Sequence, residues 1–175
     1  MRSKGIAIAV RLKAPDPEAV TAAATAERLN PEISPGRILR RDHWCFEGTR
    51  RGRETVSEIV AHYHDIVNPN KHMWEFLSDC RRFDPPDDSH RWVGVLVTDI
   101  RNTVSENWTD ILCRRGFGLE KVEYSVLWLL GFPPSLTMEK AEARAREITV
   151  STARDRGLLA NPVSQKIRIL KQEYS

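Results

Sequence analysis

The chain has 175 residues, of which 41% are hydrophobic and 29% are charged. This composition supplies enough apolar side chains for a core and excludes intrinsic disorder, while the length excludes a large multi-domain protein. The formal net charge of +3 is small and spread along the chain. This argues against nucleic acid as a partner, because nucleic-acid-binding proteins usually carry a concentrated basic surface. The sequence therefore predicts one globular domain, or two half-size units that share a core.

Neither a membrane span nor a secretion signal is predicted. The longest apolar run, residues 126–132, is far shorter than the roughly 18 residues that cross a bilayer. The N-terminal segment reaches the charged Arg11 too soon for a signal peptide. Three widely spaced cysteines, Cys45, Cys80 and Cys113, favour neither a disulfide framework nor a metal or redox motif, so we expect buried thiols. These features predict a cytoplasmic protein with no membrane partner.

The first half of the sequence predicts a strand, a helix, a pair of short strands, a second helix and a final strand. A nearly continuous apolar run opens it, as in a buried strand, and Asp16 followed by Pro17 is typical of a helix start. The predicted elements are a strand at residues 5–12, a helix at 18–29, two short strands within 38–47 joined by a tight turn near Arg41-Asp42, a helix at 54–66 and a strand within 70–76.

The second half repeats this order about 88 residues later. Its first helix is capped by Asn102 or Ser105 and ends at Gly116 or Gly118. The predicted elements are a strand at 92–100, the capped helix, two short strands within 119–132 joined near Tyr124-Ser125, a helix at 137–159 and a strand within 163–170.

The second helix of each half runs into an Asn-Pro step, and the two steps, Asn68-Pro69 and Asn161-Pro162, are 93 residues apart. Because proline cannot continue a helix, each step predicts a helix end followed by a strand. Each half therefore has the β-α-β-β-α-β order of a ferredoxin-like unit. We predict an α+β fold of two tandem ferredoxin-like repeats that form a compact pseudo-dimer, with repeats at 1–78 and 91–175 and a linker at 79–90. A single-sheet α/β fold is the alternative.

Two short passages resemble one known family. Residues 157–170 read G-L-L-A-N-P-V-S-Q-K-I-R-I-L, and residues 9–20 read A-V-R-L-K-A-P-D-P-E-A-V. They are similar to the end and the start of the PurS-type small subunit of phosphoribosylformylglycinamidine synthase. Both passages belong to a single shorter domain in that family, so the resemblance implies that one chain stands in for a PurS-type dimer. The family's Val-Arg-Gly-Lys-like hairpin has no counterpart, because Arg40-Arg41-Asp42-His43 and Glu123-Tyr124-Ser125 occupy its place.

The resemblance implies a function without catalysis. PurS-type subunits bridge the synthetase and glutaminase subunits of a glutamine-dependent, ATP-consuming ligase in purine biosynthesis. The resemblance therefore implies a non-catalytic interaction or scaffold subunit with those two subunits as partners, and it leaves a further homo-oligomer open. Such a role needs complementary surfaces and strand edges rather than an active site.

A second hypothesis makes the chain a small-molecule enzyme or binder. Ferredoxin-like pairs also form dimeric α/β barrels with a cavity between the repeats, in which a histidine acts as general base and a tryptophan ring as platform. Aromatic residues in strands more often fill a core, so the non-catalytic hypothesis is preferred and an activity of the chain by itself stays open. The candidate catalytic residues are His43, His62 and His64, and the candidate cavity-lining residues are Trp44, His72 and Trp74.

Arginines add a third group of candidate binding residues, Arg50, Arg51 and Arg53, which suit a phosphate group. Acidic neighbours favour solvated loop charge instead. His62 and His64 point to different sides of a predicted helix, so no metal site is predicted. The sequence contains neither a phosphate-binding glycine loop nor a known catalytic motif, and we predict no cofactor.

Overall fold

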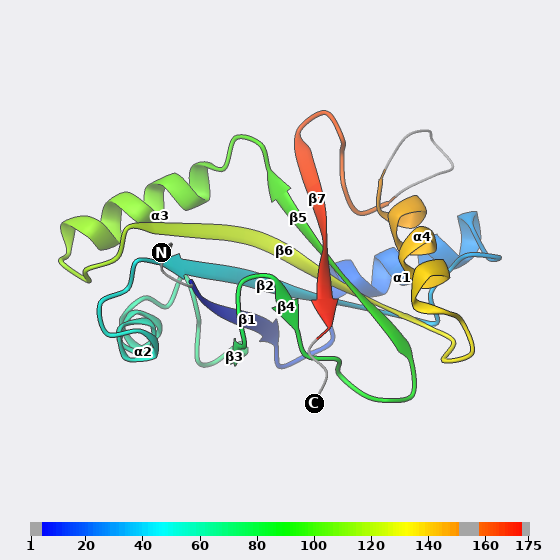
Figure 1. Cartoon of the computed structure of the whole chain (residues 1–175), viewed down its shortest axis with the longest axis horizontal. Coiled ribbons are helices and arrows are strands. Elements are labelled where there is room, and N and C mark those ends of the chain that lie inside the picture. Colours follow the sequence, from blue (N-terminus) through cyan, green and yellow to red (C-terminus); the bar gives the residue numbers. More distant parts are fainter. Residues whose placement is uncertain (1–4, 151–157, 173–175) are drawn as a thin grey trace.

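The computed structural model describes residues 5–150 and 158–172, which form four helices and seven strands (Figure 1). The fold is α+β, which confirms the predicted class. The strands are β1 (Ile6–Leu12), β2 (Arg37–Glu47), β3 (His72–Leu77), β4 (Arg82–Phe83), β5 (Arg91–Asp99), β6 (Lys121–Phe132) and β7 (Gln165–Gln172). The helices are α1 (Pro17–Leu29), α2 (Arg53–His62), α3 (Thr103–Arg114) and α4 (Met138–Thr149).

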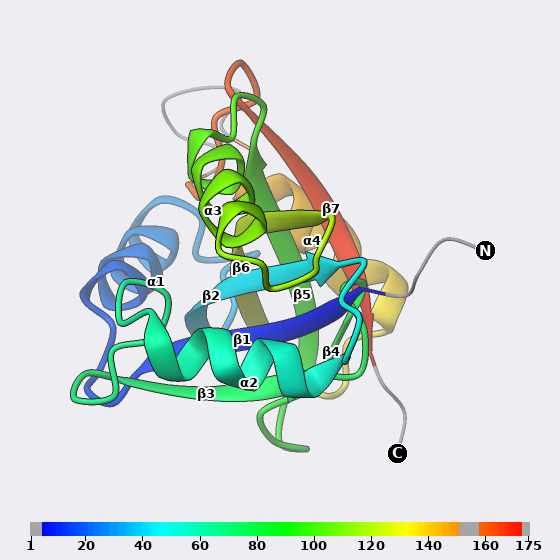
Figure 2. The same cartoon turned by 90° about the vertical axis from the view of Figure 1, so that its left-hand side faces the viewer.

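The strands of the described residues form one sheet in the order β3-β1-β2-β6-β5-β7-β4. Neighbours are antiparallel except for β4 and β7, which are parallel. The two longest strands, β2 and β6, pair at the centre from Arg37 opposite Gly131 to Glu47 opposite Lys121. Outward from this pair, β1 and β3 follow β2, just as β5 and β7 follow β6. Seen from one end, the sheet curls into a half-barrel (Figure 2).

The predicted hairpins are wrong, because β2 and β6 each run unbroken through the positions that were expected to turn. Arg41 pairs with Leu127 and Ser125 pairs with His43, both within the central ladder. Neither position contains the glycine that two-residue hairpin turns prefer. Pairing of the two long strands also satisfies main-chain groups that a turn would leave open. Each half therefore reads β-α-β-α-β instead of β-α-β-β-α-β.

The helix starts follow the sequence closely, and α1 ends at Leu29 as predicted, whereas the second helix of each half ends early. Asp16 caps α1 by accepting hydrogen bonds from two main-chain N–H groups of the first turn, and Asn102 caps α3 in a similar way. The helix predicted at 54–66 ends at His62, and the helix predicted at 137–159 ends at Thr149. Part of the latter prediction, residues 151–157, lies outside the described residues.

The four helices cover one face of the sheet, and two apolar clusters lie beneath them. One cluster lies under α2 and α3 and contains Trp44 and Phe46 of β2. The other lies under α1 and α4 and contains Trp128 and Leu130 of β6. Alanines on α1 and α4 allow these helices to pack close to the sheet, because their side chains are short. Side chains that alternate with these along each strand point to the opposite, helix-free face.

Part of the helix-free face is covered by the segment between β3 and β5. This is the predicted linker at 79–90, which contributes β4 to the sheet. Phe83 of β4 lies over Gly94 of β5, where a Cβ atom would come 2.6 Å from its ring. The buried side chains of Trp92, Leu127 and Leu129 belong to the same cluster. The segment therefore builds a third, smaller core on this face.

A disulfide joins Cys45 of β2 to Cys80, which follows β3. The prediction of free thiols is therefore wrong for these two residues, and the free thiol of Cys113 is exposed rather than buried. The two paired cysteines are 35 residues apart in the sequence. They meet because β1 pairs with both β2 and β3, so that Ala7 lies opposite Cys45 on one side and opposite Leu77 on the other.

Candidate functional site

The predicted catalytic residue His43 lies on the helix-free face of β2, with 2% of its surface exposed. Opposite it in the central ladder is Ser125, whose hydroxyl oxygen lies 2.7 Å from that of Thr98. Within the described residues, neither ring nitrogen of His43 has a hydrogen-bond partner. Leaving a buried polar group unpaired costs on the order of 1–3 kcal/mol. The packing of the fold therefore does not explain why residue 43 is a histidine.

Burial lowers the pKa of His43 to about 4, against a weaker opposing attraction from Glu123. The imidazole is therefore neutral at pH 7. It can accept one hydrogen bond and donate another, but a pKa this low makes it a weak general base. The hydroxyl of Ser125 is engaged by Thr98 rather than by the imidazole. These residues consequently do not form an activated nucleophile.

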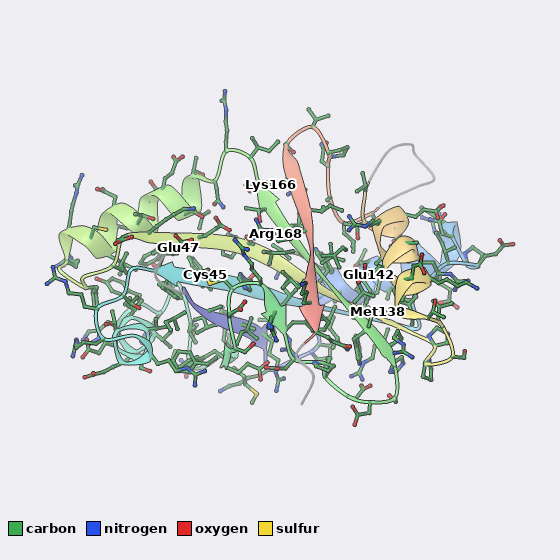
Figure 3. All side chains as sticks on the ribbon, viewed as in Figure 1. Cys45, Glu47, Met138, Glu142, Lys166 and Arg168 are labelled. Carbon is green, nitrogen blue, oxygen red and sulfur yellow. A yellow bond between two sulfur atoms is a disulfide. The ribbon has the colours of Figure 1, made fainter. Side chains whose placement is uncertain are left out.

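Charged side chains from two further strands lie on the same face as His43. Lys121 and Glu123 of β6 form an ion pair at 3.0 Å, and Lys166 and Arg168 of β7 are exposed. Figure 3 labels the two β7 side chains on the strand nearest the viewer. Both charge signs are present, so this part of the face is suited to a polar contact.

The other predicted histidines do not join His43. His62 ends α2 and is exposed, with its Nδ1 2.7 Å from a main-chain carbonyl oxygen one turn earlier. His64 is exposed in the turn after α2. His72 begins β3, and its Nδ1 accepts a hydrogen bond from the Asn68 N–H at 3.0 Å. The four side chains therefore do not line a common cavity.

The predicted binding tryptophans are packed under the helices. Trp44 is 4% exposed, and its ring centre lies 4.7 Å from that of Tyr124 and 6.2 Å from that of Trp108. Trp74 of β3 is half-buried and packs against the same cluster. Both rings belong to the helix-covered face, opposite to His43, and neither can serve it as a platform for a ligand.

The three predicted arginines lie in or next to the loop between β2 and α2. Arg51 forms ion pairs with two glutamates of α2, at 3.0 and 2.6 Å. The guanidinium of Arg53 lies 4.9 Å from the ring centre of Phe76. Arg50 extends beside Gly118. Because each side chain turns to a separate local neighbour, the three do not converge on one phosphate site.

The sequence reasoning missed a feature at the centre of the sheet, where β2 and β6 each extend beyond their outer neighbour. The ladder between β5 and β6 ends at Val126 of β6, and the ladder between β1 and β2 ends at Asp42 of β2. Residues 121–125 of β6 and 37–41 of β2 therefore have a paired strand on one side only. Such an edge leaves main-chain N–H and C=O groups that require other partners.

Helix α3 satisfies the edge of β6 with its own side chains. The Tyr124 N–H donates to Ser105 Oγ at 2.8 Å, and the Tyr124 carbonyl accepts from Asn102 Nδ2 at 2.7 Å. Thr109 Oγ1 accepts from the Val122 N–H at 2.9 Å, and its own proton has two acceptors within reach, the Ser105 carbonyl at 2.7 Å and the Val122 carbonyl at 3.3 Å. The main-chain N–H and C=O groups of the even-numbered residues in this part of β6 therefore point away from β2. In an antiparallel ladder the residues that lie opposite them on β2 are even-numbered as well, and their main-chain groups point away from β6.

Helix α1 lies beside the corresponding edge of β2 but carries alanine where α3 carries hydroxyl groups. Counted from the helix N-caps, Asp16 in α1 and Asn102 in α3, Ala19 and Ala23 stand three and seven residues along, at the places of the serine and threonine that cap β6. An alanine side chain has no hydrogen-bonding group. The helix that matches α3 is therefore unable to satisfy the edge of β2.

A groove of about 810 Å³ lies along this edge, and Ile38 and Arg40 are among the residues that line it. Their main-chain groups point away from β6, beyond the end of the ladder with β1. Within the described residues, no side chain hydrogen-bonds to the main chain of either residue. The groove is bordered by residues 12–16, by α1 and by residues 84–86. The edge of β2 is thus open towards a preformed space.

An ion-pair network stands at one end of the groove. Arg40 lies 3.6, 3.0 and 3.2 Å from carboxylate oxygens of Asp16, Glu18 and Asp42. The Tyr124 hydroxyl donates to Asp42 at 3.0 Å, and burial together with this carboxylate raises the pKa of the tyrosine. The network ties the start of α1 to β2 and so fixes one end of the groove.

Comparison with known proteins does not assign the chain to a family. No protein-family model matches it, and no curated protein matches it. Within residues 5–150 and 158–172, no three His, Cys, Asp or Glu side chains gather closely enough to hold a metal ion. The helices in the same part of the chain lack the length and apolar character needed to span a membrane. The PurS-type resemblance therefore stays a prediction from the sequence.

Proposed function

We propose that the chain is a non-catalytic interaction subunit that binds an extended segment of a partner protein by strand addition to the edge of β2. One observation carries the proposal: the outward main-chain groups of Ile38 and Arg40 meet a groove instead of a strand or a capping side chain. An added strand would exchange about four main-chain hydrogen bonds with these two residues. Each contributes about 0.5–1.5 kcal/mol. Because any sequence can form main-chain hydrogen bonds, side-chain contacts must supply the specificity.

In this proposal the two halves of the chain are tandem repeats that form a pseudo-dimer, at residues 1–78 and 91–175, joined by 79–90. The mirrored order of strands on either side of the β2–β6 pair supports this interpretation, as does the β-α-β-α-β order of both halves. A pseudo-dimer has a functional advantage over a true homodimer, because its halves can diverge. One edge can be closed by α3 while the matching edge beside α1 stays open.

The PurS-type resemblance gives the proposal a specific form. The partners are then the synthetase and glutaminase subunits of a glutamine-dependent ligase, and the chain has no activity by itself. The two resembling passages and the paired halves support this form. A cytoplasmic location belongs to it as well, and the Cys45–Cys80 disulfide weighs against that location, because disulfides persist mainly in oxidising compartments.

Native affinity purification, followed by reconstitution with the purified partner, tests the interaction. The double variant Ala19→Ser with Ala23→Thr gives α1 the hydroxyl groups that α3 uses, so it should weaken the complex roughly tenfold by satisfying the edge of β2. Ala24→Ser is the matched control, because Ala24 is exposed on the same helix and should leave binding unchanged. Full binding by the double variant would contradict strand addition.

A second candidate function, binding or conversion of a small molecule, is favoured by His43. Its two ring nitrogens have no partner within the described residues although the side chain is buried, and a ligand that enters beside β2 would supply one. His43→Ala should then abolish ligand binding or turnover, whereas it should leave partner binding at the edge of β2 intact. An unchanged affinity for every ligand found would exclude this second function.

A further inference from the structure

We infer that the segment bound at the edge of β2 is acidic at alternate positions and apolar at the positions between. This inference rests on the proposed strand addition and names the class of partner that it requires. An added strand would point successive side chains to opposite faces of the sheet. Its sequence preference is therefore set by the side chains that border the groove on each face.

On the helix-free face the border of the groove is basic on balance, with three arginines against the carboxylates of Glu75 and Asp84. Arg37 and Arg41 of β2 share this face with His43, because side chains alternate along a strand. Arg11 of β1 shares it too, since Ala9, two residues earlier, lies opposite His43. Three guanidinium groups from two strands therefore border the same side of the groove.

The basic residues that line the groove outnumber the acidic ones. Five basic and three acidic residues line it. Arg40 and Arg41 have carboxylate partners in the fold, and Arg37 has one as well but keeps 51% of its side chain exposed. Arg11 is exposed and forms no ion pair with the described residues, and Lys13 is exposed beside it. Lys13 Nζ already donates to the Pro69 carbonyl at 2.7 Å, so Arg11 is the cation that carboxylates on an added segment would find available.

On the helix-covered face the border of the groove is apolar beyond Asp16 and Arg40, which pair with each other at one end. Ala19 and Ala23 of α1 line it, and Val20 keeps 58% of its surface exposed at its rim. The Ile38 side chain is packed in the cluster beneath the helix. A polar side chain of the segment would meet no hydrogen-bonding partner among these residues, so apolar side chains are favoured on this face.

A second copy of this chain fits the groove less well than an acidic partner. Two β2 edges brought together would place Arg37 and Arg41 opposite the same residues of the other copy, and like charges on neighbouring strands are destabilising. The outer strand β3 of a second copy offers one carboxylate, Glu75, which already pairs with Arg41. The occupant is therefore a segment of a different protein.

Two labelled peptides test the inference on the full chain. The first is a fluorescein-labelled hexapeptide of sequence Glu-Val-Glu-Val-Glu-Val, and the second has lysine in place of each glutamate. Fluorescence anisotropy at low salt should give a Kd roughly tenfold lower for the acidic peptide, and added NaCl should reduce the difference. Arg11→Glu should reverse the preference. Arg101→Glu is the control, because Arg101 is exposed in the turn after β5, and it should leave the preference unchanged.

Amide exchange measured on the same samples separates failure of this inference from failure of the proposed function. Protection of the Ile38 and Arg40 amides by the acidic peptide alone is the expected result. Equal affinity for both peptides, with both amides protected, would overturn the acidic preference and leave strand addition standing. No binding of either peptide, with both amides unprotected, would overturn strand addition itself.

Discussion

Acidification from pH 7 to pH 4 should destabilise the folded chain through one buried histidine. In the folded chain burial holds the pKa of His43 at about 4, whereas an unperturbed histidine has a pKa near 6.5. Below pH 6.5 the unfolded chain therefore binds a proton that the folded chain does not bind, and falling pH favours unfolding. The contribution of His43 is fully present above pH 6.5, is lost as the pH falls, and levels off below about pH 4.

The size of this effect follows from the two pKa values. Their difference of about 2.5 corresponds to about 3 kcal/mol, at ~1.4 kcal/mol for each factor of ten in proton affinity. His43→Leu removes the titrating group, so the free energy of unfolding of this variant should not fall by this amount at pH 4. At pH 7 the variant should be at least as stable as the native chain, because leucine lacks the two unpartnered ring nitrogens.

Urea unfolding at pH 7, 5.5 and 4, followed by tryptophan fluorescence, measures the free energies of unfolding. The native chain should lose about 3 kcal/mol more than His43→Leu between pH 7 and pH 4, since the carboxylates titrate alike in both. His62→Leu is the matched control, because His62 is exposed, and it should retain the native pH dependence. An equal loss in the native chain and in His43→Leu would refute the reasoning.

Three further changes probe the strand edges and the packing of the sheet, each by urea unfolding at pH 7. Thr109→Ala removes the hydroxyl that accepts a hydrogen bond from the Val122 N–H of β6 and should cost about 1–3 kcal/mol; no loss would mean that water replaces this hydrogen bond fully. Gly94→Ala brings a methyl group to 2.6 Å from the Phe83 ring and should cost about 1–3 kcal/mol, less when combined with Phe83→Leu. Cys45→Ser breaks the disulfide and should cost about 2–4 kcal/mol, as should Cys80→Ser, and additive losses in the double variant would argue against the pairing.

Local signals in the sequence were sufficient to predict the class and order of most elements. The apolar run that became β1 and the Asp16-Pro17 helix start are readable without tertiary information, because each depends on neighbouring residues. The likeness of the two halves was also visible, from matching strands and from the two Asn-Pro steps. These signals predicted an α+β chain in two similar parts.

Pairings between distant residues were not readable in the same way. The two central strands were expected to turn near Arg41-Asp42 and near Tyr124-Ser125, and the partner that keeps each of them straight lies about 85 residues away along the chain. The Cys45–Cys80 disulfide depends on β1 lying between β2 and β3. Both features depend on which strands pair in the sheet, and neighbouring residues in the sequence do not determine that pairing.

The open edge of β2 was difficult to predict from the sequence. Ala19 and Ala23 are good helix formers, so α1 looks like an ordinary helix. The signal lay in a comparison with α3, where Ser105 and Thr109 stand at the same distances from the helix N-cap. Side chains that cap a strand edge are recognisable as such once the pairing of β2 with β6 is known.

Hydrogen exchange at individual amides of β2 and β6 tests the central claim most directly. In the free chain the Ile38 and Arg40 amides should exchange faster than those of Val122 and Tyr124, whose N–H groups donate to hydroxyls of α3. Addition of the partner segment should slow exchange at Ile38 and Arg40 and leave the β6 amides unchanged. Slow exchange at Ile38 and Arg40 in the free chain, or no change when the partner binds, would contradict an open edge that receives a strand.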